Sequence, residues 1–264
     1  MRKLVLAATV FVLAGSLVVA GEVGPPQPSE TSDIPLSVGV GYERHEAVYK
    51  PSSSSNLGII GEVTAKQERA YLQVAFALND MFEVYSRVGG ANLNLKNSIL
   101  DLGTLGPLAG VDSFRAKDSS MRFYTTLGAK GMLYEDDNIG VGPYIQASYF
   151  TPYRDRISLA PGVYGTLRVK DMWDVNAGLS AQARIGSAVV YGGPMLYASG
   201  ARVSVSENII TPGGSTMRKR FEEEGSNIGS FIGARIPLPE GMEVGVEGRY
   251  RSAFSMGISL TKAF

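Results

Sequence analysis

The chain has 264 residues with 25 basic and 25 acidic side chains, and it contains no cysteine. A balanced charge gives no reason to expect nucleic acid as a partner, and without cysteine neither disulfides nor cysteine-ligated metal sites form. Glycine (32 residues) and tyrosine (13 residues) are abundant, and past residue 20 no stretch is long and apolar enough for a transmembrane helix.

The first 20 residues have the layout of a secretory signal peptide. Arg2 and Lys3 form a basic start, an uncharged apolar run follows, and the small residues Val18 and Ala20 end it. We predict cleavage after Ala20 and export, which leaves 23 basic against 25 acidic residues. The alternative is an uncleaved inner-membrane anchor, although such spans usually need about 20 residues.

Residues 21–34 are rich in proline, serine and acidic side chains, so we expect a flexible periplasmic linker. From Pro35 to Phe264, apolar residues recur at every second position almost throughout, which is typical of β-strands. The segments with this pattern are 36–42, 72–78, 81–90, 121–133, 139–150, 170–185, 188–203, 227–236, 242–250 and 254–264. In the clearest segment, 170–185, the alternation places Lys170 and Asp174 on the polar face.

The connections between these segments differ in length. Short turns are expected near Asp80, Asp137, Ser187 and Pro239, and long connections at 96–117, 151–166 and 205–225. Short turns at one end and long loops at the other are expected of outer-membrane barrels. We predict an all-β, antiparallel, up-and-down transmembrane β-barrel over 35–264, with about ten strands and 8 or 12 as alternatives. An even strand number puts both termini at the short-turn, periplasmic end.

Aromatic residues on the predicted outward face gather near both ends of the strands. The long-loop end carries Tyr42, Tyr149, Trp173, Tyr250 and Phe254, and the short-turn end carries Phe82 and Phe264. Aliphatic residues lie between them. Two aromatic belts flanking an aliphatic band are the arrangement found at the two membrane interfaces. The opposite face is rich in glycine, alanine, serine and glutamine, which suits a narrow lumen better than bulk water.

With these features the chain resembles the bacterial outer-membrane β-barrel proteins of the small OmpA/OmpX-like or porin-like kind. The resemblance rests on the signal peptide, the alternating strands and a last strand that ends in phenylalanine, and it names no subfamily. It implies location in the outer membrane of a Gram-negative bacterium. It also implies that the barrel-assembly machinery reads the last strand, whose outward residues are Met256, Ile258, Leu260 and Phe264.

Charged side chains at inward positions are the first candidate site. They are Glu43, Glu83, Arg87, Arg122, Lys130, Lys170, Asp174, Arg184, Arg235, Glu243, Glu247, Arg249 and Arg251. One interpretation is a network of ion pairs that fills the barrel, because buried charges must be paired. The other is a polar pore that favours anions. Barrels of about eight strands are filled by their side chains and water channels come at roughly 16–18, so we favour the filled barrel.

No motif predicts catalysis, a cofactor or a metal. His45 is the only histidine, and we expect it to be a solvated residue at the outer rim. A single imidazole without cysteine makes no recognisable transition-metal site. Residues 135–138 (EDDN) are expected to form a turn rather than a calcium site, and 213–220 (GGSTMRKR) lack the spacing of a phosphate loop.

The long connection at 206–226 is the last candidate site, with basic 218–220 beside acidic 222–224. It suits lipopolysaccharide phosphates, a divalent ion or another cell, but pairing of its own charges in a solvated hairpin is the simpler interpretation. We therefore expect a monomeric, non-enzymatic outer-membrane barrel with a structural or surface-interaction role through its long loops. Its expected partners are membrane lipid, lipopolysaccharide and the assembly machinery. The alternative is a narrow porin-like channel for small solutes.

Overall fold

The computed structural model describes residues 36–51, 59–60, 63–96, 99–100, 116–136, 138–160, 163–207, 216–223 and 227–264. The predicted signal peptide and linker lie outside these residues, as does much of the 206–226 connection. Within the described part, no helix is long and apolar enough to cross a membrane.

Nearly all of the described chain is β-strand, apart from one turn of 3-10 helix, η1 (Pro239–Gly241). The strands of the first half are β1 (Leu36–Pro51), β2 (Ile59–Ile60), β3 (Val63–Asn79), β4 (Phe82–Lys96), β5 (Ile99–Leu100), β6 (Ala116–Gly131), β7 (Tyr134–Glu135) and β8 (Ile139–Phe150). Those of the second half are β9 (Tyr153–Ala160), β10 (Val163–Ile185), β11 (Ala188–Glu207), β12 (Thr216–Glu223), β13 (Ile228–Leu238), β14 (Met242–Tyr250) and β15 (Phe254–Ala263).

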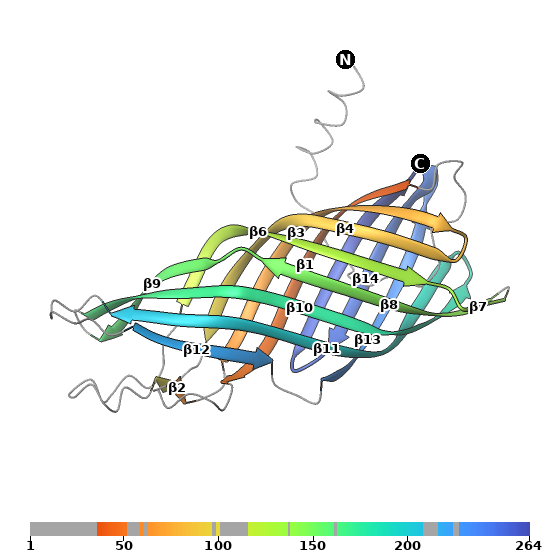
Figure 1. The fold of residues 1–264 in the computed structure, drawn as a ribbon. Helices are drawn as coiled ribbons and strands as arrows, with labels where there is room; N and C mark the ends of the chain where they lie inside the picture. The colour runs from red at the N-terminus through yellow and green to blue at the C-terminus, as the bar shows by residue number, and fades with distance from the viewer. Residues whose placement is uncertain are drawn as a thin grey trace, which may run out of the picture.

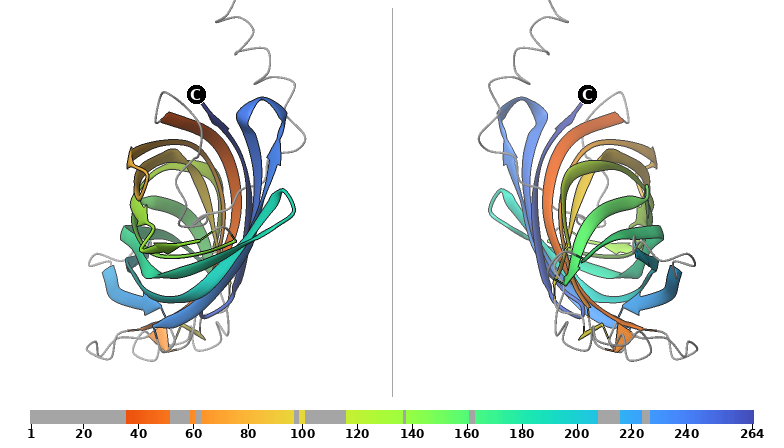
Figure 2. Two further views of the ribbon diagram at one scale, coloured as in Figure 1. Left: turned by 90° about the vertical axis from the view of Figure 1, so that its right-hand side faces the viewer. Right: turned by 90° about the vertical axis from the view of Figure 1, so that its left-hand side faces the viewer.

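Ten of the described strands close into an antiparallel barrel (Figures 1 and 2). Their order around the ring is β11, β13, β14, β15, β1, β3, β4, β6, β8 and β10, and the ladder between β10 and β11 completes it. The last strand pairs with the first, from Ser37 opposite Ala263 to Arg44 opposite Met256, and Phe264 N donates to Leu36 O at 3.0 Å. Closure leaves the ring without a free sheet edge. The predicted antiparallel barrel of ten strands is confirmed.

The connections follow the predicted asymmetry with some differences. The turns at 80–81, 132–138, 186–187 and 239–241 lie at one end, together with β7, and we call this the short-turn end (Figure 1). The other end, the long-loop end, has longer connections, and β9 and β12 lie within two that were predicted as loops. A further connection there, 52–62, was not predicted. The remaining link at this end, 251–253, is short.

In the half of the barrel toward the short-turn end, apolar side chains point outward. On β3, the exposed residues Leu72, Val74 and Phe76 alternate with inward Tyr71 and Ala75. The neighbouring strands carry the same outward band, which includes Val84, Val88, Leu127, Ile139, Ile145, Leu179, Leu196, Ile228, Ile232, Ile236, Val246, Met256 and Leu260. A continuous apolar outer surface of this extent requires a hydrocarbon environment. We call this part the membrane half.

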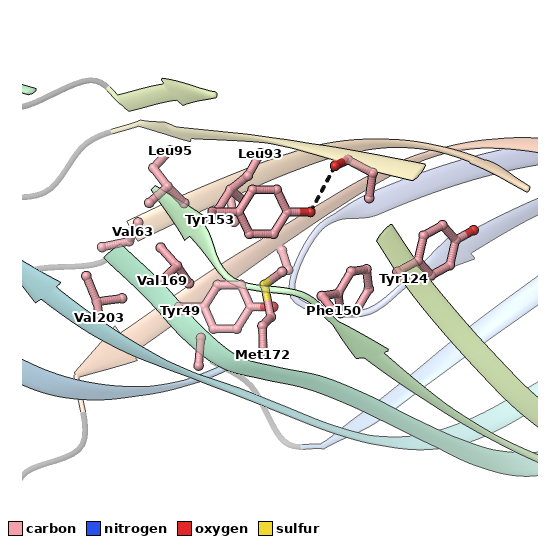
Figure 3. Close-up of a cluster of buried hydrophobic side chains, with 14 of the residues drawn as sticks. Tyr49, Val63, Leu93, Leu95, Tyr124, Phe150, Tyr153, Val169, Met172 and Val203 are labelled. Carbon is pink, nitrogen blue, oxygen red and sulfur yellow. Dashed lines mark hydrogen bonds between the residues drawn. The ribbon is translucent and has the colours of Figure 1, made fainter. Parts of the chain in front are cut away.

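Toward the long-loop end the two faces exchange their chemistry. On β1, the outward residues become Arg44, Glu46 and Lys50, while Ala47 and Tyr49 are buried inside. The buried apolar side chains form one cluster, part of which is drawn in Figure 3. It also includes Tyr71 of the membrane half, and its members are Ala47, Tyr49, Val63, Ala65, Tyr71, Ala91, Leu93, Leu95, Tyr124, Phe150, Tyr153, Leu167, Val169, Met172, Ala201 and Val203. An apolar interior with a polar exterior is the pattern of a water-exposed β-structure. We call this part the outer half.

The wall of the outer half is made of a different set of strands. β13, β14 and β15 do not extend into it, and β12 fills their place by pairing with β11 on one side and β1 on the other. β9 takes over from β8 beside β10 and lies near β6. The wall therefore consists of β1, β3, β4, β6, β9, β10, β11 and β12. Around eight strands give an interior that side chains just fill, which agrees with the continuous apolar cluster.

A β-bulge in β10 corrects one prediction. Asp171 has a φ of 51°, and the register of β10 against β11 shifts between Lys170 and Trp173. A bulge adds one residue to a strand and so reverses which residues face inward. Val169 points inward before the bulge and Asp174 after it, so Lys170 is exposed on the outside. The prediction that Lys170 lines the lumen is wrong, because it assumed unbroken alternation.

Candidate functional site

The centre of the lumen holds a charge cluster built around Glu43. This carboxylate is 1% exposed and accepts hydrogen bonds from Arg69 Nη1 at 3.3 Å and from Arg249 Nη2. Glu43 lies on β1, Arg69 on β3 and Arg249 on β14, so the cluster joins three strands. Arg249 Nε also lies 3.7 Å from a carboxylate oxygen of Glu247. Buried charges are tolerated only when paired in this way.

A second ion pair joins distant parts of the wall. Arg251 Nη1 donates to Asp174 Oδ2 at 2.6 Å, and both side chains are buried. Asp174 lies on β10 and Arg251 directly follows β14, with β11 and β13 between them in the ring. The guanidinium of Arg251 also lies over the ring of Tyr197, 4.5 Å from its centroid. The pair therefore links β10 to the end of β14 past the two strands between them.

Aromatic rings and amides fill the lumen between these pairs and the short-turn end. The Arg87 guanidinium lies against the rings of Tyr71 and Tyr85, 4.9 and 4.8 Å from their centroids, and such contacts stabilise a buried cation. Tyr85 OH on β4 donates to Gln146 Oε1 on β8 at 2.9 Å, and β6 lies between these two strands in the ring. Tyr191 OH donates to Glu247 Oε2 at 3.0 Å.

Two lumen glycines show how tightly the rings fit. A Cβ atom on Gly128 would lie 2.2 Å from Cζ of Tyr85, and one on Gly233 would lie 2.4 Å from Cζ of Tyr191. Real Cβ contacts are never this short, so each tyrosine ring lies flat over a position that only glycine accepts. At these two positions, glycine makes room for the tyrosine rings that fill the lumen.

A small polar cavity remains at the short-turn end. It has a volume of about 30 Å³ and is lined by Gln73, Glu83, Tyr85, Arg87, Lys130, Tyr191, Arg235, Glu243, Gly245, Ser259 and Thr261. Lys130 Nζ lies 3.1 Å from Glu83, and Arg235 Nη1 lies 3.2 Å from Glu243. A space of this size holds a few water molecules.

The structure distributes the predicted lumen charges over three environments. Glu43, Glu83, Arg87, Lys130, Asp174, Glu247, Arg249 and Arg251 are buried; Arg122, Arg235 and Glu243 are half-buried; Lys170 and Arg184 are exposed. Arg184 has inward parity but lies next to the 186–187 turn, beyond the end of the packed lumen. The prediction that Arg184 contributes to the interior is therefore wrong.

Several interior residues were missed because the strands are longer than the alternation indicated. β3 begins at Val63 rather than near residue 72, so Gln67 and Arg69 also point inward. β1 continues to Pro51, so His45 is buried with 1% exposure instead of solvated at a rim. Gln67 and Arg69 could have been predicted by counting back in steps of two from inward-facing Tyr71. Charged residues on both faces of this part of β3 hide the alternation.

The surroundings of His45 contain a serine and a carboxylate. Ser255 Oγ lies 3.2 Å from His45 Nδ1, and Glu43 Oε1 lies 3.6 Å from the same nitrogen. Activation of a serine needs the hydroxyl on one ring nitrogen and the acid on the other. Here both groups share Nδ1, and Nε2 is buried without a hydrogen-bond partner among the described residues. The arrangement is not that of a catalytic triad.

The predicted interface aromatics lie on the outer surface. Phe82, Tyr149, Tyr250, Phe254 and Phe264 are exposed, and Tyr42 and Trp173 are half-buried. Met256, Ile258 and Leu260 on β15 have outward parity, as does Phe264 directly after it, and Phe264 is hydrogen-bonded to the first strand. Contact with membrane interfaces and reading by the assembly machinery stay predictions.

Known proteins share the fold but not the sequence. No protein-family model matches the chain, and no characterised protein sequence is detectably similar. The outer membrane protease OmpT from Escherichia coli superimposes with a TM-score of 0.50 at 11% identity, over 89% of this chain and 100% of that one. The translocator domain of the autotransporter NalP from Neisseria meningitidis (0.48, 10%, 89% and 91%) and the toluene transporter TbuX from Ralstonia pickettii (0.42, 9%, 95% and 96%) follow.

The shared architecture defines the class of protein. The ten-stranded closure, the apolar outer band and the likeness to OmpT make this chain a β-barrel of the bacterial outer-membrane type. At 11% identity the likeness extends to the fold alone and assigns no subfamily.

Proposed function

We propose that the protein is a non-enzymatic barrel of the bacterial outer membrane with a closed lumen, and that it carries the outer half above the membrane as a surface for interactions. The observation that supports this most strongly is the Glu43 cluster, in which buried ion pairs join β1, β3 and β14 inside the lumen. The apolar cluster of the outer half closes the same passage a second time.

Opening the lumen would be costly at both levels. Separating Arg69 from Glu43 breaks a buried ion pair, which typically costs about 3–5 kcal/mol. A path through the outer half would also have to displace Tyr153, which packs among leucines and donates to Ala91 O at 3.1 Å (Figure 3). Two successive closures favour a structural role over solute flow.

The second candidate function is a narrow channel for small solutes. It is favoured by the polar cavity at the short-turn end, where Lys130 and Arg235 lie with Glu83 and Glu243. In this alternative the cavity is a vestibule, and Arg87 with its two tyrosine rings is the gate. Solute passage then requires these side chains to move together.

Planar-bilayer recording of the purified barrel tests the proposal. A closed barrel gives no steady conductance, and Glu247→Gln lowers its melting temperature because Tyr191 and Arg249 lose an ionised partner. Glu243→Gln is the matched control, since its half-exposed carboxylate lies at the rim. A steady conductance whose ion selectivity changes in Glu247→Gln, without a change in melting temperature, would establish the channel instead.

A further inference from the structure

The outer surface of the outer half has an uneven arrangement of charge. On β1 and β3, residues directly opposite each other carry opposite charges: Arg44 faces Glu68, and Glu46 faces Lys66 with 2.5 Å between Nζ and the carboxylate. Opposite charges at such positions stabilise a sheet, and like charges destabilise it. This side of the outer half is therefore electrostatically satisfied by its own residues.

On β9, β10 and β11 the pairing is reversed. Arg154 lies directly opposite Arg168, and Lys170 lies directly opposite Arg202. Arg154, Lys170 and Arg202 are exposed, and Arg168 is half-buried. The backbone ladder continues the pattern, because the position of Arg220 on β12 lies opposite Arg202. We call Arg154, Arg168, Lys170 and Arg202 the basic face.

Few acids compensate the basic face. Among the described outward side chains of these strands, the one acid is Asp171, whose Oδ2 lies 3.1 Å from Arg202 Nη1. Asp155, half-buried beside them, accepts from the backbone N of Arg156 at 2.7 Å. Arg168 Nε is buried and has no hydrogen-bond partner within the described part of the chain. A guanidinium held against like charges, with a donor that no described residue uses, is a place where an anion can bind.

The position of the basic face identifies the source of that anion. Trp173 pairs with Tyr149 on the adjacent strand, both with outward parity, and this pair marks the upper limit of the apolar band. Lys170 lies opposite Arg202 and Trp173 opposite Gly200, two residues apart on β11, so the bulge leaves them ~7 Å apart along the strand. Phosphates of lipid headgroups lie just beyond the hydrocarbon at this level, and each nearby Lys or Arg attracts an anionic surface by about 1 kcal/mol.

We propose that the basic face binds the phosphorylated headgroups of the membrane lipids surrounding the barrel, and that it fixes which side of the outer half faces those headgroups. The proposal rests on the membrane location under the proposed function. Bidentate arginines match phosphate geometry, and a phosphate between Arg154 and Arg168 replaces their mutual repulsion by two attractive contacts. On β1 and β3, Glu46 and Glu68 repel the same headgroup.

A lipid titration in neutral detergent tests this without requiring insertion. The barrel is titrated with phosphatidic acid, with phosphatidylcholine and with inorganic phosphate, and bound lipid is counted by native mass spectrometry. Wild type should retain phosphatidic acid over phosphatidylcholine. Arg168→Gln with Lys170→Gln should weaken phosphatidic acid binding about thirtyfold, from two basic residues near the lipid surface. The matched control, Arg44→Gln with Lys66→Gln, removes the same charge on β1 and β3 and should stay within about twofold of wild type.

Thermal melting provides a second readout that a merely structural role would not give. Without anionic lipid, the β10 double variant should melt at or above the wild-type temperature, because like-charge repulsion is relieved. With phosphatidic acid, wild type should gain more stability than the variant, so that the order reverses.

Three results would overturn the inference. These are equal binding losses in both double variants, no preference for phosphatidic acid, or stabilisation by inorganic phosphate alone at the same concentration, which would indicate a soluble-anion site. The two proposals can fail separately. A barrel that gives no conductance and shows no lipid preference refutes only the proposal for the basic face. A barrel that conducts and prefers phosphatidic acid refutes only the proposal of a closed lumen.

Discussion

The membrane half and the outer half share β1, β3, β4, β6, β10 and β11, and these strands carry opposite chemistry in the two halves. On β3, Leu72 and Phe76 face outward in the membrane half, whereas Lys66 and Glu68 face outward in the outer half. Inside, Arg69 belongs to an ion-pair network and Val63 to an apolar core. One strand thus changes environment within a few residues. Alternation along a strand therefore does not by itself indicate which face contacts lipid.

The comparison also shows two ways to close a barrel. The membrane half is sealed by paired charges and tyrosines, because lipid outside leaves the lumen as the place for polar groups. The outer half has water outside and is sealed by an apolar cluster, as in soluble proteins. The predictions below separate these two closures.

The largest effect is expected at the charge cluster. Glu43→Gln removes the buried carboxylate that Arg69 and Arg249 share and should reduce the free energy of unfolding by about 3–5 kcal/mol. Unfolding in urea, followed by the heat-dependent shift in gel mobility, measures this. Glu46→Gln on the outer surface of the same strand is the control, and an equal loss there would refute the special role of the buried pair.

Truncation in the outer half should cost nearly as much. Leu93 is buried in the apolar cluster (Figure 3), so Leu93→Ala should lower the free energy of unfolding by about 2–5 kcal/mol. Leu72→Ala is the control, since this side chain faces outward in the membrane half and its removal leaves no internal cavity. Similar losses for the two variants would contradict the division into halves.

An introduced arginine should distinguish the two outer surfaces. Ile232, 66% exposed near the middle of β13, lies in the apolar band, and Ile232→Arg should cost ~2–4 kcal/mol of stability in lipid. Val48→Arg has outward parity in the outer half and should cost much less. Folding yield into phosphatidylcholine vesicles measures both. A larger defect at Val48 would reverse the assignment of the halves.

The smallest effect concerns the turn between β6 and β8. Asp136 Oδ1 accepts from the backbone N of Asn138 and of Ile139, each at 3.0 Å, and these bonds hold the pKa of its carboxyl below the ordinary value. A carboxyl whose pKa is lowered on folding stabilises the folded state at pH values above its unfolded pKa of about 4. This stabilisation is lost as the pH falls through the folded-state pKa. Asp136→Asn should lower the melting temperature slightly at pH 7 and not at all at pH 2. A difference that persists at pH 2 would exclude the charge as its cause.

Much of the fold follows from alternation, but the site does so only in part. The strands around Leu72–Leu78 and Val175–Ile185 alternate cleanly because one face meets lipid, and there the predicted parity is right. It fails at Lys170, where the bulge at Asp171 inserts a residue that no composition signal marks. The predicted first strand also ends before His45. In the outer half polar residues lie outside and mixed residues inside, so the sequence there lacks clear alternation and resembles a loop.

The location of the water–lipid boundary is the most direct test of this account. The chain contains no cysteine, so single cysteines placed at outward positions of β3 from Thr64 to Phe76 carry a nitroxide label each without background. We predict that labels at 64, 66 and 68 are accessible to a water-soluble relaxation agent, that labels at 72, 74 and 76 are accessible to oxygen dissolved in lipid, and that the crossover lies near Ala70. Lipid exposure along the whole of β3, or water exposure at Leu72–Phe76, would contradict the two-half barrel.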